Sequence, residues 1–416
     1  MREMKDSGIE WVGTIPAHWS TMPNKYVMRK IKVINPTYNG ENILSLTVNG
    51  VIVRDLEAGG KMPSSFDGYQ ILYKGNLLMC LFDYDVTPRC IGLIKDSGVS
   101  SPAYSQFVLQ RGNDAAYFYY YYLMVDHTKA LLHRAKNLRH SFTEEQLGAI
   151  KVPVPPIAEQ ERIADFLDSQ CSQIDAISAD IQKEIETLEQ YKRSLVFEAI
   201  SKGINGEKTA NASSDIWKEI PQSWKLVDIK YLFEIVKRIA GREGYNILSV
   251  TQKGLKVKDI SGNQGQIAEN YSGYQFVFPS DYVMNHMDLL TGWIDCSDQF
   301  GVTSPDYRVF RLRDKTQNDT EYYKYVMQCC YMCRIFYSLG QGVSTLGRWR
   351  LQTSAFMNFK VPVPPLHEQK EIARYLNDKC KEIELSIEQK RKQLELLSSY
   401  KKSLIYEYVT GKKEVI

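Results

Sequence analysis

Two long stretches of the chain carry apolar residues at the spacing of an amphipathic helix. Residues 157–202 contain no proline or glycine, and apolar residues recur every seven positions, at Leu167, Ile174, Ile181, Leu188 and Leu195, with Ile163, Ile177 and Tyr191 between them. A second stretch repeats the pattern at Ile372, Leu376, Ile383, Ile387, Leu394, Leu397 and Leu404. A seven-residue repeat is typical of coiled coils. The pattern predicts two helical rods of roughly 65–70 Å, which we expect to pack against each other in antiparallel orientation.

The same proline-rich segment precedes both predicted helices. Lys151-Val-Pro-Val-Pro-Pro-Ile-Ala-Glu-Gln160 and Lys360-Val-Pro-Val-Pro-Pro-Leu-His-Glu-Gln369 lie 209 residues apart, about half of the chain. Prolines lack the backbone N–H and favour extended neighbours, so each segment is expected to be an extended strap. Upstream, Trp11…Trp19 is echoed by Trp217…Trp224. These echoes indicate a tandem duplication whose two globular parts share a fold but differ in their loops.

The segments between the helices show mixed patterns. Val48–Arg54 and Leu77–Phe82 have the character of strands, and Ala115–Leu132, with its run of tyrosines, that of a helix packed on its own sheet. Residues 141–146 offer a capping box for a short helix. The expected fold is α+β, with two similar mixed α/β domains joined by an antiparallel coiled coil of two long helices and related by a pseudo-twofold axis. The expected divisions are a first domain at 1–150, a strap and helix at 151–204, a linker at 205–214, a second domain at 215–359, and a second strap and helix at 360–416.

Composition narrows the class of protein. Apolar residues make up 44% and charged residues 24% of the chain, as in ordinary soluble proteins. No run of about 18 apolar residues is present, so we expect no membrane span. The first residues lack the apolar core of a signal peptide, which favours the cytoplasm. The net charge of +3 permits nucleic-acid binding without requiring it. Cys330 and Cys333 have a metal-like spacing, but no second pair completes a zinc set, so no metal is expected.

The order of these segments resembles the specificity subunit of type I restriction–modification systems. The resemblance covers essentially the whole chain and rests on the two Val-Pro-Val-Pro-Pro straps, each followed by Glu-Gln, and on the opening Gly8-Ile-Glu-Trp-Val-Gly-Thr-Ile-Pro-Ala-His-Trp19. It implies that each globular domain is a target-recognition domain for one half of a bipartite double-stranded DNA sequence. It also implies that the rods space the halves and dock two methyltransferase subunits, with a restriction/translocase subunit as an optional further partner.

Catalysis is expected on the partners and not on this chain. The resemblance implies no cofactor here, with S-adenosylmethionine, ATP and Mg²⁺ on the partner subunits. Asn35-Pro-Thr-Tyr38 is one residue from the adenine-methyltransferase motif, but too few residues precede it for a cofactor-binding unit, so we interpret it as a chance match. A phosphate-binding loop of the Gly-x4-Gly-Lys-Ser/Thr type is absent from the sequence.

Cations in expected loops are the candidate DNA contacts. In the first domain they are Arg54, Lys61, Lys74, Arg89, Arg134, Lys136 and Arg139, and in the second they are Lys237, Arg238, Arg242, Lys253, Lys256, Arg348 and Arg350. Two other hypotheses stay open. The chain could be a coiled-coil scaffold whose domains bind something other than DNA, or a self-sufficient methyltransferase, which would have to bind S-adenosylmethionine.

Overall fold

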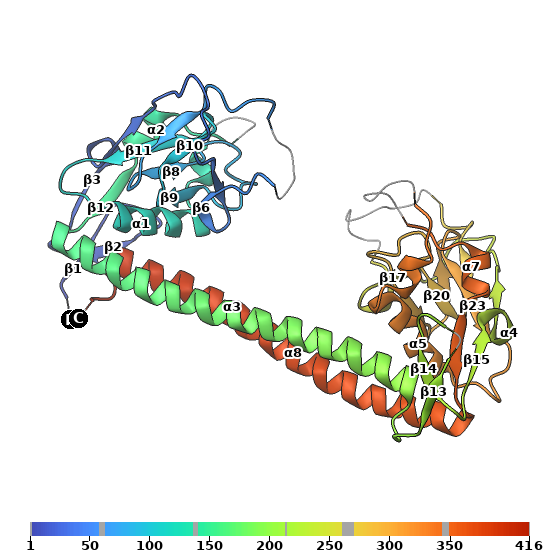
Figure 1. Cartoon of the computed structure of the whole chain (residues 1–416). Coiled ribbons are helices and arrows are strands. Elements are labelled where there is room, and N and C mark those ends of the chain that lie inside the picture. Colours follow the sequence, from blue (N-terminus) through green and yellow to red (C-terminus); the bar gives the residue numbers. More distant parts are fainter. Residues whose placement is uncertain are drawn as a thin grey trace. The chain divides into compact units, whose positions relative to one another are not determined.

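The computed structural model describes residues 2–57, 63–135, 140–212, 214–259, 270–342 and 349–415 (Figure 1). The chain forms two compact units. Unit 1 combines Met1–Ile181 with Lys392–Ile416, and unit 2 is Gln182–Arg391. Each unit therefore contains one globular domain and part of each long helix. Lys61, Lys136, Arg139 and Arg348, four of the predicted DNA contacts, lie outside the described residues.

Unit 1 is built from short antiparallel strands and two packed helices. Its strands are β1 (Met4–Asp6), β2 (Thr14–Pro16), β3 (Ser20–Pro23), β4 (Met28–Ile31), β5 (Leu44–Thr47), β6 (Gly50–Val53), β7 (Gln70–Leu72), β8 (Leu77–Met79), β9 (Ile91–Leu93), β10 (Gly98–Ser100), β11 (Ser105–Leu109) and β12 (Lys151–Val154). Its helices are α1 (Ala115–His127), α2 (Glu144–Ala149), the beginning of α3 (Ile157–Lys202) and the end of α8 (Leu366–Val409), with single 3₁₀ turns at Asn24–Tyr26 and Leu132–Arg134.

Unit 2 repeats this architecture. Its strands are β13 (Thr209–Asn211), β14 (Glu219–Pro221), β15 (Lys225–Asp228), β16 (Phe233–Val236), β17 (Leu248–Thr251), β18 (Gly254–Val257), β19 (Gln275–Val277), β20 (Tyr282–Met284), β21 (Ile294–Cys296), β22 (Gly301–Thr303), β23 (Arg308–Leu312) and β24 (Lys360–Val363). Its shorter helices are α4 (Ile229–Leu232), α5 (Thr320–Met332), α6 (Ile335–Ser338) and α7 (Thr353–Met357).

The sheets have the same topology in both units. The four-stranded sheet runs β4-β11-β8-β9 in unit 1 and β16-β23-β20-β21 in unit 2, all antiparallel. One 13-residue helix packs on the last strand of each sheet, α1 on β9 (Figure 1) and α5 on β21. A two-stranded hairpin follows the first sheet strand in each case, β5–β6 and β17–β18. The α+β prediction with two similar domains is confirmed at the level of topology.

The straps are edge strands. β12 pairs with β3 and β24 pairs with β15, both antiparallel. Proline cannot donate a ladder hydrogen bond and is tolerated at an edge, which is where each strap lies. The prediction that the straps are extended is therefore confirmed. Each strap is paired with a strand of its own domain and is not a free segment between domain and helix.

Within each unit, α3 and α8 run antiparallel. In unit 1, Lys401 Nζ binds Asp175 Oδ1 at 2.6 Å. In unit 2, Lys192 pairs with Glu384 and Lys390 pairs with Glu184, so rising numbers in α3 meet falling numbers in α8. The antiparallel prediction is thus supported in both units.

The predicted seam positions lie on the sides of the helices that are turned away from solvent. Leu167, Ile174, Leu195, Leu376, Ile383 and Leu404 are buried, and Ile181, Leu188 and Leu397 are half-buried. Ile177 and Tyr191 are 49% and 54% exposed, so the prediction that they border the seam is wrong. The apolar row beside the seam runs instead through Cys171 and Ile185, because spacings alternate between three and four residues.

Several boundaries differ from the sequence-based expectation. The strand expected at Val48–Arg54 begins at Gly50, because residues 48 and 49 form the turn of a hairpin. The expected linker at 205–214 contains β13, which pairs with β14. The capping box is confirmed at Thr143 and Gln146. Among the described residues, none of the helices is long and apolar enough to cross a membrane, and in the same ranges we find no group of three metal-ligating side chains.

Candidate nucleic-acid interface

In unit 1 the first turn of α3 is bonded to the globular domain through Glu159. The Trp19 indole Nε1 donates to Glu159 Oε2 at 3.0 Å, and His18 Nε2 lies 2.9 Å from the same oxygen. Arg2 pairs with the other carboxylate oxygen. Burial acts to raise the pKa of Glu159, but the hydrogen bonds from His18, Arg2 and Trp19 outweigh it and hold the pKa below its ordinary 4.5. Glu159 is therefore a buried anion fixed by three donors.

The neighbouring Gln160 connects the strap, α1 and α3. Its Oε1 accepts from the Asp114 backbone N–H at 2.8 Å, and its Nε2 donates to the Pro155 carbonyl at 2.8 Å. Asp114 in turn caps α1 by accepting from the Tyr117 N–H at 2.7 Å. Gln160 is fully buried. One amide thus satisfies backbone groups that burial would otherwise leave unpaired.

Unit 2 repeats the Trp–Glu contact and both contacts of the glutamine side chain. The Trp224 Nε1 donates to Glu368 Oε2 at 2.8 Å. Gln369 Oε1 accepts from the Asp319 N–H at 2.8 Å, and Gln369 Nε2 donates to the Pro364 carbonyl at 2.9 Å. We call these contacts the joint, made by Glu159 and Gln160 in unit 1 and by Glu368 and Gln369 in unit 2. The joint explains why Glu-Gln follows both straps.

The tyrosines of α1 and α5 belong to the core rather than to a base-stacking surface. Tyr117 and Tyr121 are fully buried, as is Tyr322 in α5. Two hydroxyl groups reach the long helices, because Tyr120 donates to Asp168 at 2.6 Å and Tyr325 donates to Asn377 at 2.8 Å. The expectation of an aromatic helix packed on its own sheet is confirmed.

The hairpins β5–β6 and β17–β18 share one backbone scaffold. Thr47 and Thr251 each donate from the hydroxyl to the carbonyl of the glycine three residues later, at 3.1 and 2.8 Å. Those glycines, Gly50 and Gly254, have φ of 98° and 97°, a region that favours glycine. The strand registers also correspond, with Ser45 opposite Ile52 and Ser249 opposite Lys256.

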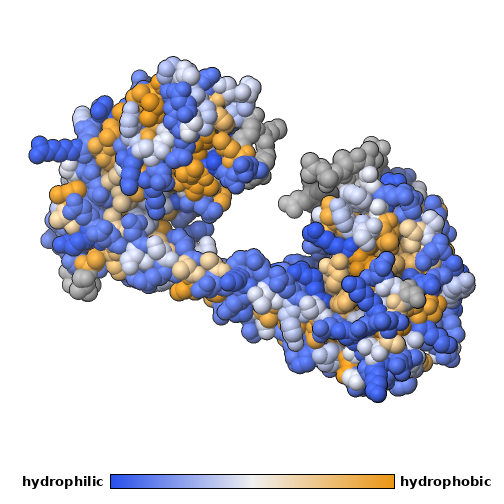
Figure 2. All heavy atoms as spheres, in the orientation of Figure 1, coloured by the Kyte–Doolittle hydropathy of each residue, from blue (hydrophilic) through white to orange (hydrophobic). Residues whose placement is uncertain are grey.

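The outward side chains of the two hairpins are different. In unit 1 the turn residue Val48 is 62% exposed and Ile52 is 42% exposed, and Asn49 is exposed beside them. In unit 2 the corresponding residues are Gln252, Lys256 and Lys253, all exposed. Figure 2 shows apolar residues on the surface of the N-terminal unit in the region that Figure 1 labels β6. The sequence-based search missed Val48, Asn49, Ile52 and Gln252 because it considered only cations. Aligning the two repeats between their shared Thr and Gly would have found them.

Different polar side chains hold the two hairpins. The Arg89 guanidinium donates to the Ile91 carbonyl at 3.0 Å, to the Val48 carbonyl at 2.8 Å and to the Tyr119 hydroxyl. In unit 2, Asp295 Oδ2 accepts from the Leu255 N–H at 2.8 Å. Arg89, one of the predicted DNA contacts, thus has donors engaged inside unit 1, and the structure gives it a positioning role.

The remaining described cations are scattered over loops. Lys74 is exposed in the turn between β7 and β8, and Lys237 is exposed directly after β16. Arg134 lies over the Trp11 ring at 5.2 Å. The Arg54 backbone N–H donates to the Ile43 carbonyl at 2.7 Å at the end of β6. These positions are compatible with phosphate contacts, and their role stays a prediction.

Arg238 and Arg242 lie against a surface cluster of four aromatic rings in unit 2. Arg238 stacks on Phe278 at 4.7 Å and pairs with Asp281, and Arg242 stacks on Tyr245 at 5.5 Å. The other rings of the cluster are Phe276 and Phe300. The described part of unit 1 has a smaller group of contacting rings, Tyr38, Phe66 and Tyr69, and its cation–π contacts lie on other rings.

Arg308 is a buried cation that the sequence-based search did not consider. Its Nη2 donates to the Leu351 carbonyl at 3.0 Å and to Thr353 Oγ1 at 3.2 Å. Burial lowers the pKa of Arg308 to about 10, so the side chain stays charged at neutral pH. These bonds hold the segment that carries Arg350, a predicted contact whose Nη2 lies 3.7 Å from Met287 Sδ.

The near-match to a methyltransferase motif is occupied by internal contacts. Asn35 Nδ2 donates to Glu41 Oε1 at 3.0 Å, and the Tyr38 hydroxyl donates to the Glu41 carbonyl at 3.1 Å. An amide that grips a flipped adenine must have free hydrogen-bonding groups. These contacts favour the interpretation as a chance match.

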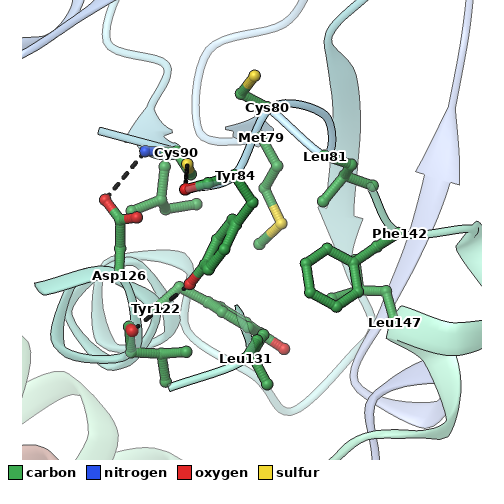
Figure 3. A pocket seen from close by; sticks show the side chains of 12 residues that line it. Met79, Cys80, Leu81, Tyr84, Cys90, Tyr122, Asp126, Leu131, Phe142 and Leu147 are labelled. Carbon is green, nitrogen blue, oxygen red and sulfur yellow. Dashed lines mark hydrogen bonds between the residues drawn. The ribbon is translucent and has the colours of Figure 1, made fainter. Parts of the chain in front are cut away.

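An apolar cavity in unit 1 offers no reactive group (Figure 3). It is lined mainly by Met79, Leu81, Ile91, Val125, Leu131 and Phe142, with the Cys90 thiol and the Tyr84 ring at its wall. Asp126 Oδ2 accepts from the Cys90 N–H at 2.9 Å. Burial, reinforced by Asp126, raises the pKa values of both Cys90 and Tyr84. Neither group is a ready nucleophile, because a raised pKa disfavours the thiolate of Cys90 and the phenolate of Tyr84, which are the reactive forms.

Comparisons with known proteins agree with this architecture. The family model described as "Type I restriction modification DNA specificity domain" matches residues 65–187 and 221–396. A specificity subunit of the type I restriction enzyme MjaVIII of Methanocaldococcus jannaschii is 27% identical over 285 residues, which cover 64% of this chain and 63% of that protein. The putative MjaX specificity subunit of the same organism is 27% identical over 305 residues, covering 69% and 64% of the two chains. The chain thus spans just under two thirds of the length of these relatives.

One solved structure has a similar fold. A chain from a study of complex assembly and conformational transition of the type I R-M system aligns with a TM-score of 0.67 at 13% identity, covering 96% of this chain and 99% of that one. At this identity the similarity concerns the fold alone.

Proposed function

Since this chain belongs to the family of type I restriction modification DNA specificity domains, we propose that it reads a split DNA sequence for a type I restriction–modification complex. Each unit reads one half of the target. The observation that carries this proposal is the pair of hairpins, which share turn bonds and register but present different exposed side chains. Two copies of one scaffold with different surface chemistry suit a protein that recognises two different half-sites.

The long helices have two proposed roles. They fix the spacing between the half-sites, and their outer faces dock two methyltransferase subunits, with restriction/translocase subunits as further partners. The outer faces carry charged residues interspersed with exposed apolar ones, Ile177, Tyr191, Leu385, Leu396 and Tyr400, which leaves those faces available to other proteins. S-adenosylmethionine, ATP and Mg²⁺ are proposed to act on the partner subunits.

We also propose that this chain is not itself catalytic. The polar groups of its one methyltransferase-like motif are used internally, and burial raises the pKa values of the Cys80 and Cys90 thiols in the unit 1 cavity. Its contribution to the reaction is therefore recognition and positioning of DNA for the methyltransferase subunits.

A selection experiment tests the proposal. The purified chain, together with the methyltransferase subunits of its own system, is incubated with a pool of random DNA duplexes, and the bound duplexes are sequenced. We expect one motif with two fixed halves and an unspecified gap, bound with an affinity that falls steeply with salt. Methyltransferase subunits without this chain are the control. A pool without enrichment, partner present, would favour a scaffold whose domains bind something other than DNA.

A further inference from the structure

We propose that the two hairpins are the base-reading elements, and that β5–β6 recognises A·T base pairs while β17–β18 requires a guanine. This inference rests on the proposed function. An antiparallel two-stranded ribbon fits the DNA major groove, which is about 12 Å wide and presents a distinct pattern for each base pair. Each unit has such a ribbon, with its turn and one side exposed.

The hairpins are rigid enough to hold side chains in register with base edges. Leu46 and Val51 pack on the sheet so closely that a Cβ on Gly92 would lie 2.6 Å from Val51 Cγ2. In unit 2, Val250 and Leu255 pack on the sheet core in the same way. The turn bonds add to this packing. A preorganised element loses little entropy on binding, so the identity of its outer side chains can decide which sequence is bound.

The outer side chains of β5–β6 match A·T pairs. Val48 and Ile52 expose apolar surface that would otherwise favour burial, and the thymine methyl is the apolar group of the major groove. The Asn49 amide, exposed at the turn between them, can donate a hydrogen bond to adenine N7 and accept one from adenine N6–H. The cation that lies at this turn, Arg89, is half-buried, and its guanidinium is bonded to the Val48 and Ile91 carbonyls rather than presented as the ribbon's outer side chain.

The outer side chains of β17–β18 match a site that contains guanine. Lys253 at the turn and Lys256 on the adjoining strand are exposed, and the groove face of guanine offers two acceptors, O6 and N7. Gln252 beside them makes one long hydrogen bond, from Nε2 to the Thr291 carbonyl at 3.4 Å. The two ribbons therefore present apolar plus amide groups in one unit and cationic groups in the other.

Other exposed groups fit a recognition role less well. The aromatic cluster around Phe278 occurs in unit 2 without a counterpart in the described part of unit 1, so a device common to both units cannot depend on it. Lys74 and Lys237 are exposed in loops, where contact with phosphate is enough to explain them.

A side-chain transplant tests the inference. In unit 1, Val48→Gln, Asn49→Lys and Ile52→Lys introduce the residues of the second hairpin, and the variant is taken through the duplex selection with its methyltransferase partners. We expect one half-site to acquire a guanine, with a change in preference of about tenfold or more at the affected base pair. The other half-site and the gap stay as in the parent.

The reciprocal variant shows which unit reads which half-site. Gln252→Val, Lys253→Asn and Lys256→Ile should alter the half-site that the first variant leaves unchanged, replacing a G·C pair by A·T. Glu145→Lys, on α2, adds the same positive charge to unit 1 outside the hairpin and should leave the motif unchanged. A half-site that becomes random in the transplant also supports the hairpin as reader.

The possible results test the hairpin inference and the proposed function separately. If the parent chain selects a split motif and both transplants, folded as judged by circular dichroism, select the same motif, the hairpin inference is overturned and the proposed function stands. If the parent chain itself enriches no motif, the proposed function fails first.

Discussion

The glutamine contacts of the two joints are nearly identical, whereas the tips of the hairpins share only a backbone. In both joints a buried Gln accepts from an N-capping Asp and donates to a strap carbonyl, at distances that agree within 0.1 Å. At the tips, Val48 and Asn49 correspond to Gln252 and Lys253. The parts that hold a domain on its helix are therefore constrained by buried hydrogen bonds, and the parts that face solvent are free to differ.

The strongest test of the shared joint is removal of its amide. Gln160→Ala and Gln369→Ala each leave a buried N–H and a buried carbonyl without partners, at about 1–3 kcal/mol for each group. We expect each change to destabilise its own unit by about 3 kcal/mol, measured by hydrogen exchange of the peptides in each unit. Gln182→Ala, at an exposed position on α3, is the control. If one substitution destabilised its own unit and the other did not, the joints would not be equivalent.

The joints differ at their carboxylates, which predicts an unequal effect of Glu→Gln. Glu159 accepts from Trp19, His18 and Arg2, whereas Glu368 accepts from Trp224, with His367 at 4.0 Å. Glu159→Gln should cost about 2 kcal/mol in unit 1, and Glu368→Gln about 1 kcal/mol in unit 2.

The same carboxylate predicts a pH dependence. The pKa of Glu159 in the folded protein lies below 4.5, so its ionised form stabilises unit 1 above the unfolded pKa, and this stability is lost as the pH falls through the lower folded value. The protection of unit 1 against hydrogen exchange, corrected for the intrinsic pH dependence of amide exchange, should therefore fall more in the parent than in Glu159→Gln between pH 6 and about pH 3. An equal loss of protection in both chains would contradict this.

The hydroxyl groups of Tyr120 and Tyr325, which bond to the long helices, should also contribute unequally to the stability of the two units. Tyr120 donates to a carboxyl group on α3, and Tyr325 donates to an amide on α8. Bonds to charged acceptors are the stronger, so Tyr120→Phe should cost about 1.5–2 kcal/mol and Tyr325→Phe about 1 kcal/mol. Asp168→Asn replaces the carboxylate acceptor of unit 1 by an amide, as in unit 2. In this background Tyr120→Phe should cost only about 1 kcal/mol.

The smallest effect is expected at a pair of equivalent ion pairs. Lys192–Glu384 in unit 2 and Lys401–Asp175 in unit 1 occupy corresponding positions, with the lysines 25% and 24% exposed and the acids largely exposed. Each pair should contribute at most about 1 kcal/mol. Double-mutant cycles with Lys→Met and acid→Ala should give coupling energies that agree between units and decrease in high salt.

The sequence predicted the large elements because their signals are repetitive. The seven-residue spacing gave both long helices, and the paired prolines gave both extended straps. The Glu-Gln pair of each joint could be found in the sequence, but its contacts could not be predicted. Trp19 and Glu159 are 140 residues apart in the chain and come together only in the folded domain.

The candidate recognition surface was harder to predict for a different reason. A rule that selects cations found Lys253 and Lys256 but passed over Asn49 and Ile52, which occupy the equivalent places in unit 1. It also selected Arg89, whose guanidinium is engaged with carbonyl groups inside unit 1. Surface chemistry depends on which way a side chain points, and short strands carry too little periodicity to fix that direction from sequence.

The division of the chain into units has a consequence for the order of events during synthesis. The core of unit 1 includes Leu404 and Val409, and Val409 accepts from Tyr117, 292 residues earlier. At about 5–20 residues per second, the ribosome needs roughly 15–60 s to cover that distance. Unit 2 is continuous in sequence and is complete in the meantime. The domain that leaves the ribosome first is thus the last to have its core completed. Until then, Trp19 and Tyr117 lack part of the packing that buries them.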